Sequence, residues 1–224
     1  MNEDGDVKIY YAPFEYLNPQ ARIVLVGITP GPTQMANANT EARRALLAGA
    51  SDVDAMKSAK DVAAFSGEPM RGNLSRQLNH WGFQQWLEIE DASTLFSTAR
   101  HLVQTTSLLR FPVFVRGADY RGTPDMLKHP LLRSHLLGHF AEEVKLLDKA
   151  VFIGLGPKVQ SVLDLLVGQG HLAAERVIGG MLHPSGNCTY RINYLTGQRT
   201  TAIPHATNPF PYDDGRRRFK DAYL

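Results

Sequence analysis

Short apolar runs alternate along the chain with longer segments whose apolar residues follow helical spacing. The short runs are rich in β-branched residues, as strands buried on both faces of a sheet should be, and cover residues 22–27, 101–109, 150–156 and 175–180. Apolar residues at three- and four-residue steps predict helices over residues 33–48, 52–64, 73–80, 130–148 and 157–167. The chain therefore alternates between strands and helices.

The alternation predicts an α/β fold. We expect a three-layer sandwich in which a central, mostly parallel sheet of about four strands is flanked by helices. In the helix expected over residues 130–148, one face collects the apolar side chains of Leu132, Leu136, Phe140, Val144 and Leu147. Neither an internal repeat nor a linker interrupts the pattern, so we expect a single domain over residues 1–224.

Composition narrows the class of protein. The 224 residues are 43% hydrophobic and 21% charged, which suits one large globular domain. No apolar run approaches a membrane span, and the N-terminus lacks the layout of an export signal, so we expect a cytoplasmic protein without membrane contact. A single cysteine, Cys188, excludes an intramolecular disulfide and an all-cysteine metal centre, and we interpret it as a bystander.

Charge is informative only locally. The formal net charge is +2, too small to indicate a polyanionic partner by itself. Basic residues exceed acidic ones between residues 181 and 224, where they include Arg216, Arg217 and Arg218. This excess could follow a phosphate backbone, or it could belong to a solvated tail.

Three Gly/Pro-rich loops follow predicted strands. They cover residues 27–31, 154–160 and 181–187. Ligands of parallel α/β sheets bind beyond the carboxyl ends of the strands, and glycine-rich loops there can surround an anion with backbone N–H groups. The loops therefore indicate a phosphate-binding site at one edge of the sheet, unless each loop only reverses the direction of the chain.

Familiar catalytic signatures are missing from the sequence. The loop at residues 27–34 lacks the Gly-Lys-Ser/Thr ending of a P-loop, and the loop at 154–159 lacks the third glycine of a dinucleotide fingerprint. The eight histidines include no HExxH pair, and Gly72-Asn73-Leu74-Ser75 has the wrong spacing for a nucleophile elbow. Metal-dependent and serine-hydrolase chemistry is therefore disfavoured.

The ordered set of loops resembles the uracil-DNA glycosylase superfamily. Gly27-Ile28-Thr29-Pro30-Gly31 is similar to the loop after the first strand of these enzymes, and His183-Pro184-Ser185 to the loop after the last. The segments GLGPKVQ at 154–160 and TTSLLRFP at 105–112 look like the phosphate-pinching loop and the base-reading strand.

The resemblance implies roles for individual residues. His183 and Thr29 would be catalytic, His183 as the neutral donor to the departing base and Thr29 as the residue that positions water. The residues implied to bind the base are Gly27, Ile28, Pro30, Gly31, Phe65 and Ser107. The residues implied to bind DNA are Gly154, Gly156, Pro157, Lys158, Pro184, Ser185, Asn187 and Arg191. On the alternative interpretation, His183 caps the Pro184 turn and Phe65 belongs to the core.

Three positions depart from the family pattern. Most active relatives carry an acidic or amide side chain where Thr29 stands, and a hydroxyl is a poorer clamp on water, so catalysis should be weakened. Ser107 stands where relatives often carry an asparagine, and one hydroxyl cannot read a base edge with two bonds. Gly31 replaces the tyrosine of strict uracil enzymes, which implies a wider pocket.

The segment after His183 is expected to fill the gap that a flipped nucleotide leaves. Tyr190, Ile192 or Tyr194 could provide the wedge while Arg191 meets a phosphate. The alternating pattern of Tyr190, Ile192 and Tyr194 equally suits a buried β-hairpin.

Three classes of function remain open. The first is a monomeric, monofunctional DNA glycosylase that removes uracil or a related deaminated base from single-stranded or mismatched DNA without metal or organic cofactor. The second is a non-catalytic member of the same fold that binds nucleic acid or a free nucleobase. The third is an unrelated small-molecule hydrolase on a similar sandwich.

Overall fold

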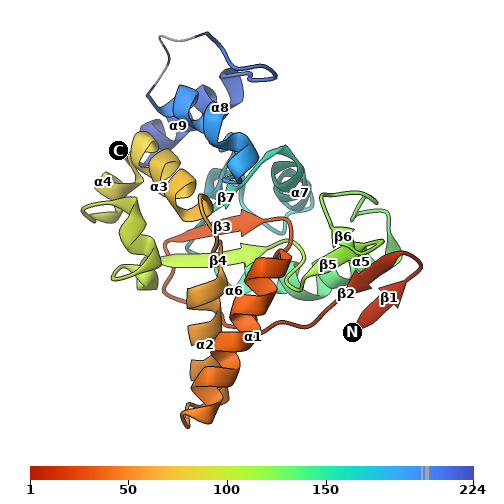
Figure 1. Cartoon of the computed structure of the whole chain (residues 1–224). Helices are drawn as coiled ribbons and strands as arrows, with labels where there is room; N and C mark the ends of the chain where they lie inside the picture. Colours follow the sequence, from red (N-terminus) through yellow and green to blue (C-terminus); the bar gives the residue numbers. More distant parts are fainter. Residues whose placement is uncertain (198, 200–201) are drawn as a thin grey trace. The chain divides into compact units, whose positions relative to one another are not determined.

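Figure 1 shows the structure, a computed structural model that describes residues 1–197, 199 and 202–224. Contacts divide the chain into two compact units. Unit 1 comprises Met1–Pro19, Val26–Ser66 and Thr105–Asp148, and unit 2 comprises Gln20–Leu25, Gly67–Gln104 and Lys149–Leu224. The chain thus alternates between the units, and the expectation of a single domain over residues 1–224 stays a prediction.

A parallel sheet contains the four predicted strands. Its order is β4-β3-β7-β8, where β4 is Val103–Ser107, β3 is Ile23–Gly27, β7 is Val151–Gly154 and β8 is Val177–Ile178. Arg22 N donates to Leu102 O and Leu108 N donates to Gly27 O, so β3 and β4 run in the same direction. All residues of β3 and β7 are buried, which explains their continuous apolar runs. The α/β class is confirmed, with strands shorter than the apolar runs.

A second sheet, which the sequence did not predict, lies in unit 1. It is antiparallel in the order β1-β2-β5-β6, formed by β1 Asn2–Asp4, β2 Val7–Ile9, β5 Val113–Val115 and β6 Ala118–Asp119. Strands of two or three residues are too short for an alternating pattern to stand out. The expectation of one sheet of about four strands is therefore corrected to two sheets of four strands each.

Two long helices of unit 1 pack side by side (Figure 1). They are α1 Pro32–Leu47 and α2 Asp52–Ala63, within one residue of the predicted bounds. Proline occupies the first helical position of α1, where no backbone donor is lost, and the Ser51 side chain caps α2 by accepting from Asp54 N. Small residues let the chain pack closely in a core cluster of Ala12, Phe14, Ala38, Ala59 and Ala63.

The helix predicted over residues 130–148 is interrupted. It consists of α5 Pro130–His135, a π-helical turn over Leu136–Phe140 and α6 Ala141–Leu146. The predicted apolar face is confirmed, because each of its five side chains is at most 2% exposed. The π turn keeps the burial pattern while changing the backbone hydrogen bonds, so periodicity could not reveal it.

The described helices of unit 2 are α3 Met70–Trp81, α4 Phe83–Leu87, α7 Pro157–Gly168, α8 Thr189–Thr196 and α9 Phe210–Tyr223. Helices α3 and α7 were predicted, whereas α4, α8 and α9 were not. Helix α9 carries the C-terminal arginines, and its Tyr212 and Phe219 are buried. A Cβ added at Gly180, where φ is +108°, would overlap Pro211 O, so glycine permits a close backbone approach there. The solvated-tail interpretation of this segment is therefore wrong.

No helix in the described part of the chain is both long enough and apolar enough to span a membrane.

Candidate functional site

The predicted site residues are divided between the two units. Unit 1 holds the loop at 27–31, Phe65 and Ser107, whereas unit 2 holds the loops at 154–158 and 181–187. Thr29 and His183 therefore belong to different units.

Three of the predicted base-binding residues meet in unit 1. A Cβ built on Gly27 would lie 3.4 Å from Ser107 Oγ and 3.6 Å from Phe65 Cε1. The backbone at the end of β3 thus faces an aromatic ring and a hydroxyl that come from segments far apart in the sequence. Bare backbone, a flat apolar ring and a hydrogen-bonding hydroxyl are the kinds of group that hold a planar polar ligand.

Phe65 combines burial with a strained backbone. Its side chain is 6% exposed, and its φ of +50° lies in the left-handed region, which is uncommon for an aromatic residue. Helix α2 ends just before it, and Asn37 Nδ2 donates to Ser66 Oγ at 3.0 Å. The core interpretation is correct as to burial, and the ring lies beside Gly27.

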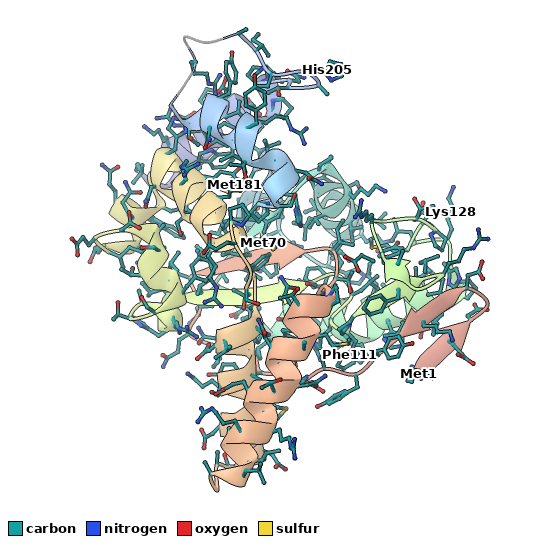
Figure 2. All side chains as sticks on the ribbon, in the orientation of Figure 1. Met1, Met70, Phe111, Lys128, Met181 and His205 are labelled. Atoms are coloured by element: carbon teal, nitrogen blue, oxygen red, sulfur yellow. The ribbon has the colours of Figure 1, made fainter. Side chains whose placement is uncertain are left out.

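The hydroxyl of Thr29 is engaged with backbone in unit 1. It donates to Phe111 O at 2.9 Å and accepts from Val113 N at 3.2 Å. Phe111, labelled in Figure 2, comes just before strand β5. A hydroxyl has one donor and two acceptor positions, so Thr29 retains a single acceptor position for any other group. The bonds connect the loop at 27–31 to the antiparallel sheet.

The other residues of this loop also have structural partners. Ile28 O accepts from Leu109 N at 2.9 Å, and Pro30 is buried. Gly31 caps helix α1, because its O accepts from Met35 N and its N donates to Gln34 Oε1. These hydrogen bonds hold the loop, and its residue Gly27 lies beside Phe65 and Ser107.

His183 in unit 2 is held as a neutral hydrogen-bond donor. Ser185 N donates to His183 Nδ1 at 3.3 Å, so the ring proton resides on Nε2. Desolvation by burial lowers the pKa of His183 below its ordinary value of 6.5, which favours the neutral ring at pH 7. A neutral imidazole with Nε2–H is the form that the resemblance requires.

Two buried amides on α3 hold the His183 loop, and sequence reasoning missed both. Gln77 is 0% exposed; its Nε2 donates to Leu182 O at 3.1 Å and its Oε1 accepts from Leu182 N at 2.9 Å. Asn73 Nδ2 donates to Pro184 O at 3.0 Å. Two amides four residues apart, and therefore on one face of the helix, were the available signal. They fix the backbone on both sides of His183.

The loop at 154–158 packs against the His183 loop. Gly156 N donates to Met181 O at 3.0 Å, and a Cβ on Gly156 would lie 3.7 Å from His183 Cβ. Gly156 has a φ of +96°, and Pro157 begins α7. A left-handed glycine is therefore needed where the two loops meet.

The segment after His183 is a helix. A 3₁₀ turn at Gly186–Cys188 leads into α8, so the expected loop and the alternative hairpin are both wrong as to secondary structure, while the gap-filling role stays a prediction. Ile192 and Tyr194 are buried in α8 and cannot act as wedges, whereas Tyr190 is 65% exposed. The pattern of these three residues was misleading because aromatic and β-branched residues at alternate positions also suit a strand.

The remaining predicted DNA-binding residues differ in exposure. Pro184 is buried, Ser185 and Arg191 are half-buried, and Lys158 and Asn187 are exposed. Arg191 Nη2 contacts the Sγ of the buried Cys188 at 3.1 Å. Gly154 packs against Gln160, since an added Cβ would be 2.9 Å from Gln160 Oε1.

The three arginines of α9 are engaged within unit 2. Arg216 Nε donates to His80 O at 2.9 Å, and Arg218 donates to Val177 O at 3.4 Å. Arg217 forms ion pairs with Asp214 and Asp221 on its own helix. They do not form a uniform basic stripe.

A buried charged cluster in unit 1 was also missed. Thr106 donates to Glu143 Oε2 at 2.9 Å, and Arg110 lies 3.4 Å from the same oxygen. Glu143 is 2% exposed, so its charge requires these partners. Burial lowers the pKa of Lys60 to about 8, with Glu143 opposing the shift, and Lys60 Nζ donates to Tyr16 O. The cluster fixes the strand that carries Ser107.

Comparisons with known proteins identify one relative. No family model matches the chain, and no solved structure matches it. The chain is 34% identical over 199 residues to "Uncharacterized protein YoxB" of Bacillus subtilis (strain 168), an alignment that covers 88% of this chain and 77% of the relative. The chain therefore belongs to the same family as YoxB.

Proposed function

We propose that this protein is a DNA glycosylase-like hydrolase. It cleaves the N-glycosidic bond of uracil, or of a related deaminated base, that has been flipped out of DNA. We also propose that the parallel sheet is the central layer of a three-layer sandwich. Both proposals extend the resemblance of the loops at 27–31 and 183–185.

One observation carries the proposal, namely the meeting of Gly27, Phe65 and Ser107 in unit 1. The resemblance implies base binding for all three, and their proximity in unit 1 supports that role. Phe65 would stack on the base, and Ser107 would meet its polar edge. The left-handed backbone of Phe65 adds support, because strain of this kind collects at functional sites.

The chemistry would depend on His183. A departing base carries negative charge on its carbonyl oxygen, and a preorganised neutral donor stabilises that charge. The Nε2–H tautomer, fixed by the bond from Ser185 N, supplies such a donor. The two buried amides of α3 would keep the ring in place without contacting the substrate.

DNA would be held by the loops of unit 2. The exposed side chains of Lys158 and Asn187 would meet phosphates. The N–H groups of Gly156 and Ser185 are bonded to Met181 O and His183 Nδ1, so these two residues would shape the loops that face DNA. Tyr190 is the exposed aromatic residue of α8 and would take the wedge position proposed for this segment. Neither metal nor organic cofactor enters the proposed reaction.

A second candidate function follows from Thr29. Its hydroxyl donates to Phe111 O, so it has no proton left to donate and only one acceptor position for water. A site without a firm clamp on water can still bind a base. The second candidate is therefore a non-catalytic member of the fold that binds nucleic acid or a free nucleobase.

An excision assay distinguishes the candidates. Single- and double-stranded oligonucleotides that carry uracil, hypoxanthine, xanthine or ethenocytosine are incubated with the protein, and abasic sites are cleaved with alkali. The glycosylase produces cleavage that depends on His183. Binding without cleavage supports the second candidate, and neither binding nor cleavage refutes both.

The variant Thr29→Asn sharpens this assay. An amide offers two N–H donors and two acceptor positions, so it can replace both backbone bonds of Thr29 and still hold water. We expect it to raise uracil excision above that of the wild type. Thr29→Ser, which keeps the hydroxyl, is the matched control and should excise at the wild-type rate.

A further inference from the structure

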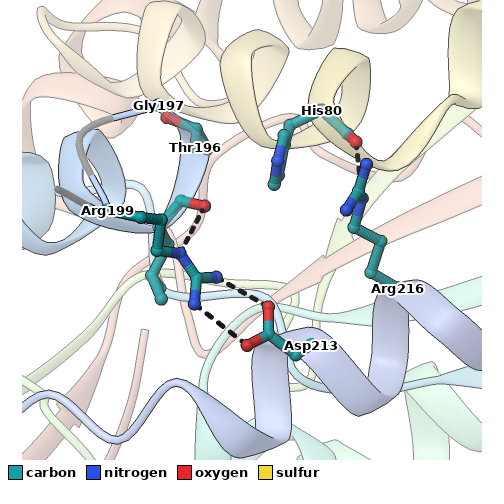
Figure 3. A pocket seen from close by; sticks show the side chains of 7 residues that line it. His80, Thr196, Gly197, Arg199, Asp213 and Arg216 are labelled. Atoms are coloured by element: carbon teal, nitrogen blue, oxygen red, sulfur yellow. Dashed lines mark hydrogen bonds and ion pairs between the residues drawn. The ribbon is translucent and has the colours of Figure 1, made fainter.

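Unit 2 contains a small polar pocket that the proposed function does not use. Its volume is about 260 Å³, and its lining residues are His80, Leu195, Thr196, Gly197, Arg199, Asp213 and Arg216. They come from α3, from the end of α8 and the residues that follow it, and from α9 (Figure 3). The volume is below the range of about 300–1,000 Å³ that suits drug-sized ligands, so the pocket fits a small ligand or a single group of a larger one.

The pocket carries a net positive charge. Two guanidinium groups, those of Arg199 and Arg216, face one carboxylate, that of Asp213. Arg199 Nε donates to Leu195 O, and its two terminal nitrogens donate to the carboxylate of Asp213 at 3.0 and 2.6 Å. Each of those terminal nitrogens still has a second N–H. A metal cation is disfavoured here, whereas an anion would be attracted.

Arg216 supplies further donors. Its Nε donates to His80 O at 2.9 Å, and it forms no ion pair with a described residue. The four N–H groups of its terminal nitrogens are therefore not used by an acidic side chain. Figure 3 shows this guanidinium beside the ring of His80, across the pocket from Arg199.

His80 adds hydrogen-bonding capacity without charge. Its Nδ1 lies 3.1 Å from Tyr212 Oη, and its ring stacks on that of Tyr212. Burial, and after it the charges of Arg216 and Arg199, lower the pKa of His80 to about 4, so the ring is neutral at pH 7. The Tyr212 hydroxyl is the better donor of this pair, so Nδ1 accepts from it and Nε2 carries the ring proton, which makes His80 the third donor side chain that lines the pocket.

We propose that the His80 pocket binds a phosphate group. Donors from three side chains match the oxygens of a tetrahedral oxyanion. A carboxylate presents two oxygens in one plane, so the donors of one of the three side chains would have no acceptor. The group could be free phosphate or the phosphate of a nucleic-acid backbone. The proposal does not depend on glycosylase activity, because its test measures phosphate binding.

Isothermal titration of the full chain with inorganic phosphate, at constant chloride concentration, tests the proposal. We expect saturable binding that Arg216→Gln weakens by on the order of tenfold or more, as loss of charge-assisted hydrogen bonds does. The matched control is Arg217→Gln, on the same helix but paired with Asp214 and Asp221 outside the pocket, and its effect should stay within about twofold.

A third variant is expected to increase affinity. Asp213→Asn removes the competing carboxylate and should tighten phosphate binding by about threefold. A gain of affinity requires a folded protein, so it separates the proposal from simple damage. If Arg199 and Asp213 formed only a structural clamp, this variant would bind phosphate no better than the wild type.

The source of the phosphate is distinguished by a second titration. The same variants are titrated with a single-stranded oligonucleotide without a lesion, by fluorescence anisotropy. A loss with Arg216→Gln but not Arg217→Gln assigns the site to the nucleic-acid backbone, and a loss confined to inorganic phosphate assigns it to a free anion. Absence of saturable phosphate binding, or equal losses in both variants, would overturn the proposal.

Discussion

The two loops that carry the predicted catalytic residues use their polar atoms differently. In unit 1, the Thr29 hydroxyl donates to Phe111 O and accepts from Val113 N, so two of its three hydrogen-bonding positions are occupied by backbone. In unit 2, backbone and the Gln77 amide hold the His183 loop, and among the described residues the imidazole is hydrogen-bonded through Nδ1, which leaves the proton on Nε2. Thr29 supports the structure around it, whereas His183 is supported by the structure around it.

This difference separates structural from chemical roles. A side chain whose donors and acceptors are bonded to backbone contributes stability, and its loss leaves buried groups unpaired. A side chain positioned by other residues can direct a remaining donor at a ligand. We therefore expect removal of the Thr29 hydroxyl to act mainly on stability and removal of the His183 imidazole to act mainly on activity.

The largest expected effect is that of His183→Ala. Loss of a preorganised donor should lower the excision rate by a factor of about 10² to 10³ on whichever base is accepted. DNA affinity, measured by fluorescence anisotropy, should hardly change. His205→Ala removes an exposed histidine of the same unit and is the control. Equal rates in the two variants would remove His183 from the reaction.

A smaller effect is expected from Gln77→Met. The methionine fills a similar volume but leaves Leu182 N and O unpaired in a buried site, at a cost of about 3 kcal/mol in the free energy of unfolding. Excision should fall by about tenfold, because His183 is displaced rather than removed. Urea unfolding and excision rates are measured together. An effect no larger than that of Gln85→Met, at an exposed position, would show that the amide does not hold the loop.

Thr29→Val tests the structural side of the comparison. The change removes both hydrogen bonds and should lower the free energy of unfolding by about 2 kcal/mol, while Thr29→Ser keeps the hydroxyl and should cost less. Urea unfolding measures both. If Thr29→Val is as stable as the wild type, the hydroxyl does not stabilise the packing of the loop at 27–31 against strand β5.

The smallest expected effect is on the pH profile. Burial lowers the pKa of His183 below 6.5, so the rate should be constant from about pH 7.5 upward and fall on acidification. At pH 6 the loss should be less than about fivefold, because a depressed pKa leaves much of the ring neutral. Protonation would place a proton on Nδ1 opposite Ser185 N–H, which breaks the bond that orients the ring. The kcat/KM of the wild type between pH 5 and 8 shows this decline, and His183→Ala should lack it.

Sequence reasoning succeeded where a pattern repeats over many residues. The strands β3 and β7 are continuous buried runs, and α1 and α2 follow their predicted bounds closely. It failed for short elements whose stability comes from distant partners. Val7 pairs with Val115, and neither three-residue strand has a pattern of its own. The helix α8 was mistaken for a loop or hairpin because aromatic and β-branched residues at alternate positions also suit strands.

The candidate site shows the same division. Gly27, Phe65, Ser107 and His183 were proposed from the resemblance of short motifs to the glycosylase superfamily, and their roles stay predictions. Glu143, Asn73 and Gln77 were not identified. A buried polar residue is recognisable only through the partner that satisfies it, and these partners lie tens of residues away.

The sequence by itself determined the α/β alternation, the parallel strands and the residue types of the two loops, because burial periodicity and turn chemistry are local properties. Tertiary structure decided which polar atoms remain available. Whether the Thr29 hydroxyl meets backbone or ligand depends on Phe111 and Val113, and whether His183 keeps its proton on Nε2 depends on Ser185 and on the amides of α3. A hydrogen bond is a property of a pair of atoms, and the fold alone brings the second atom into place.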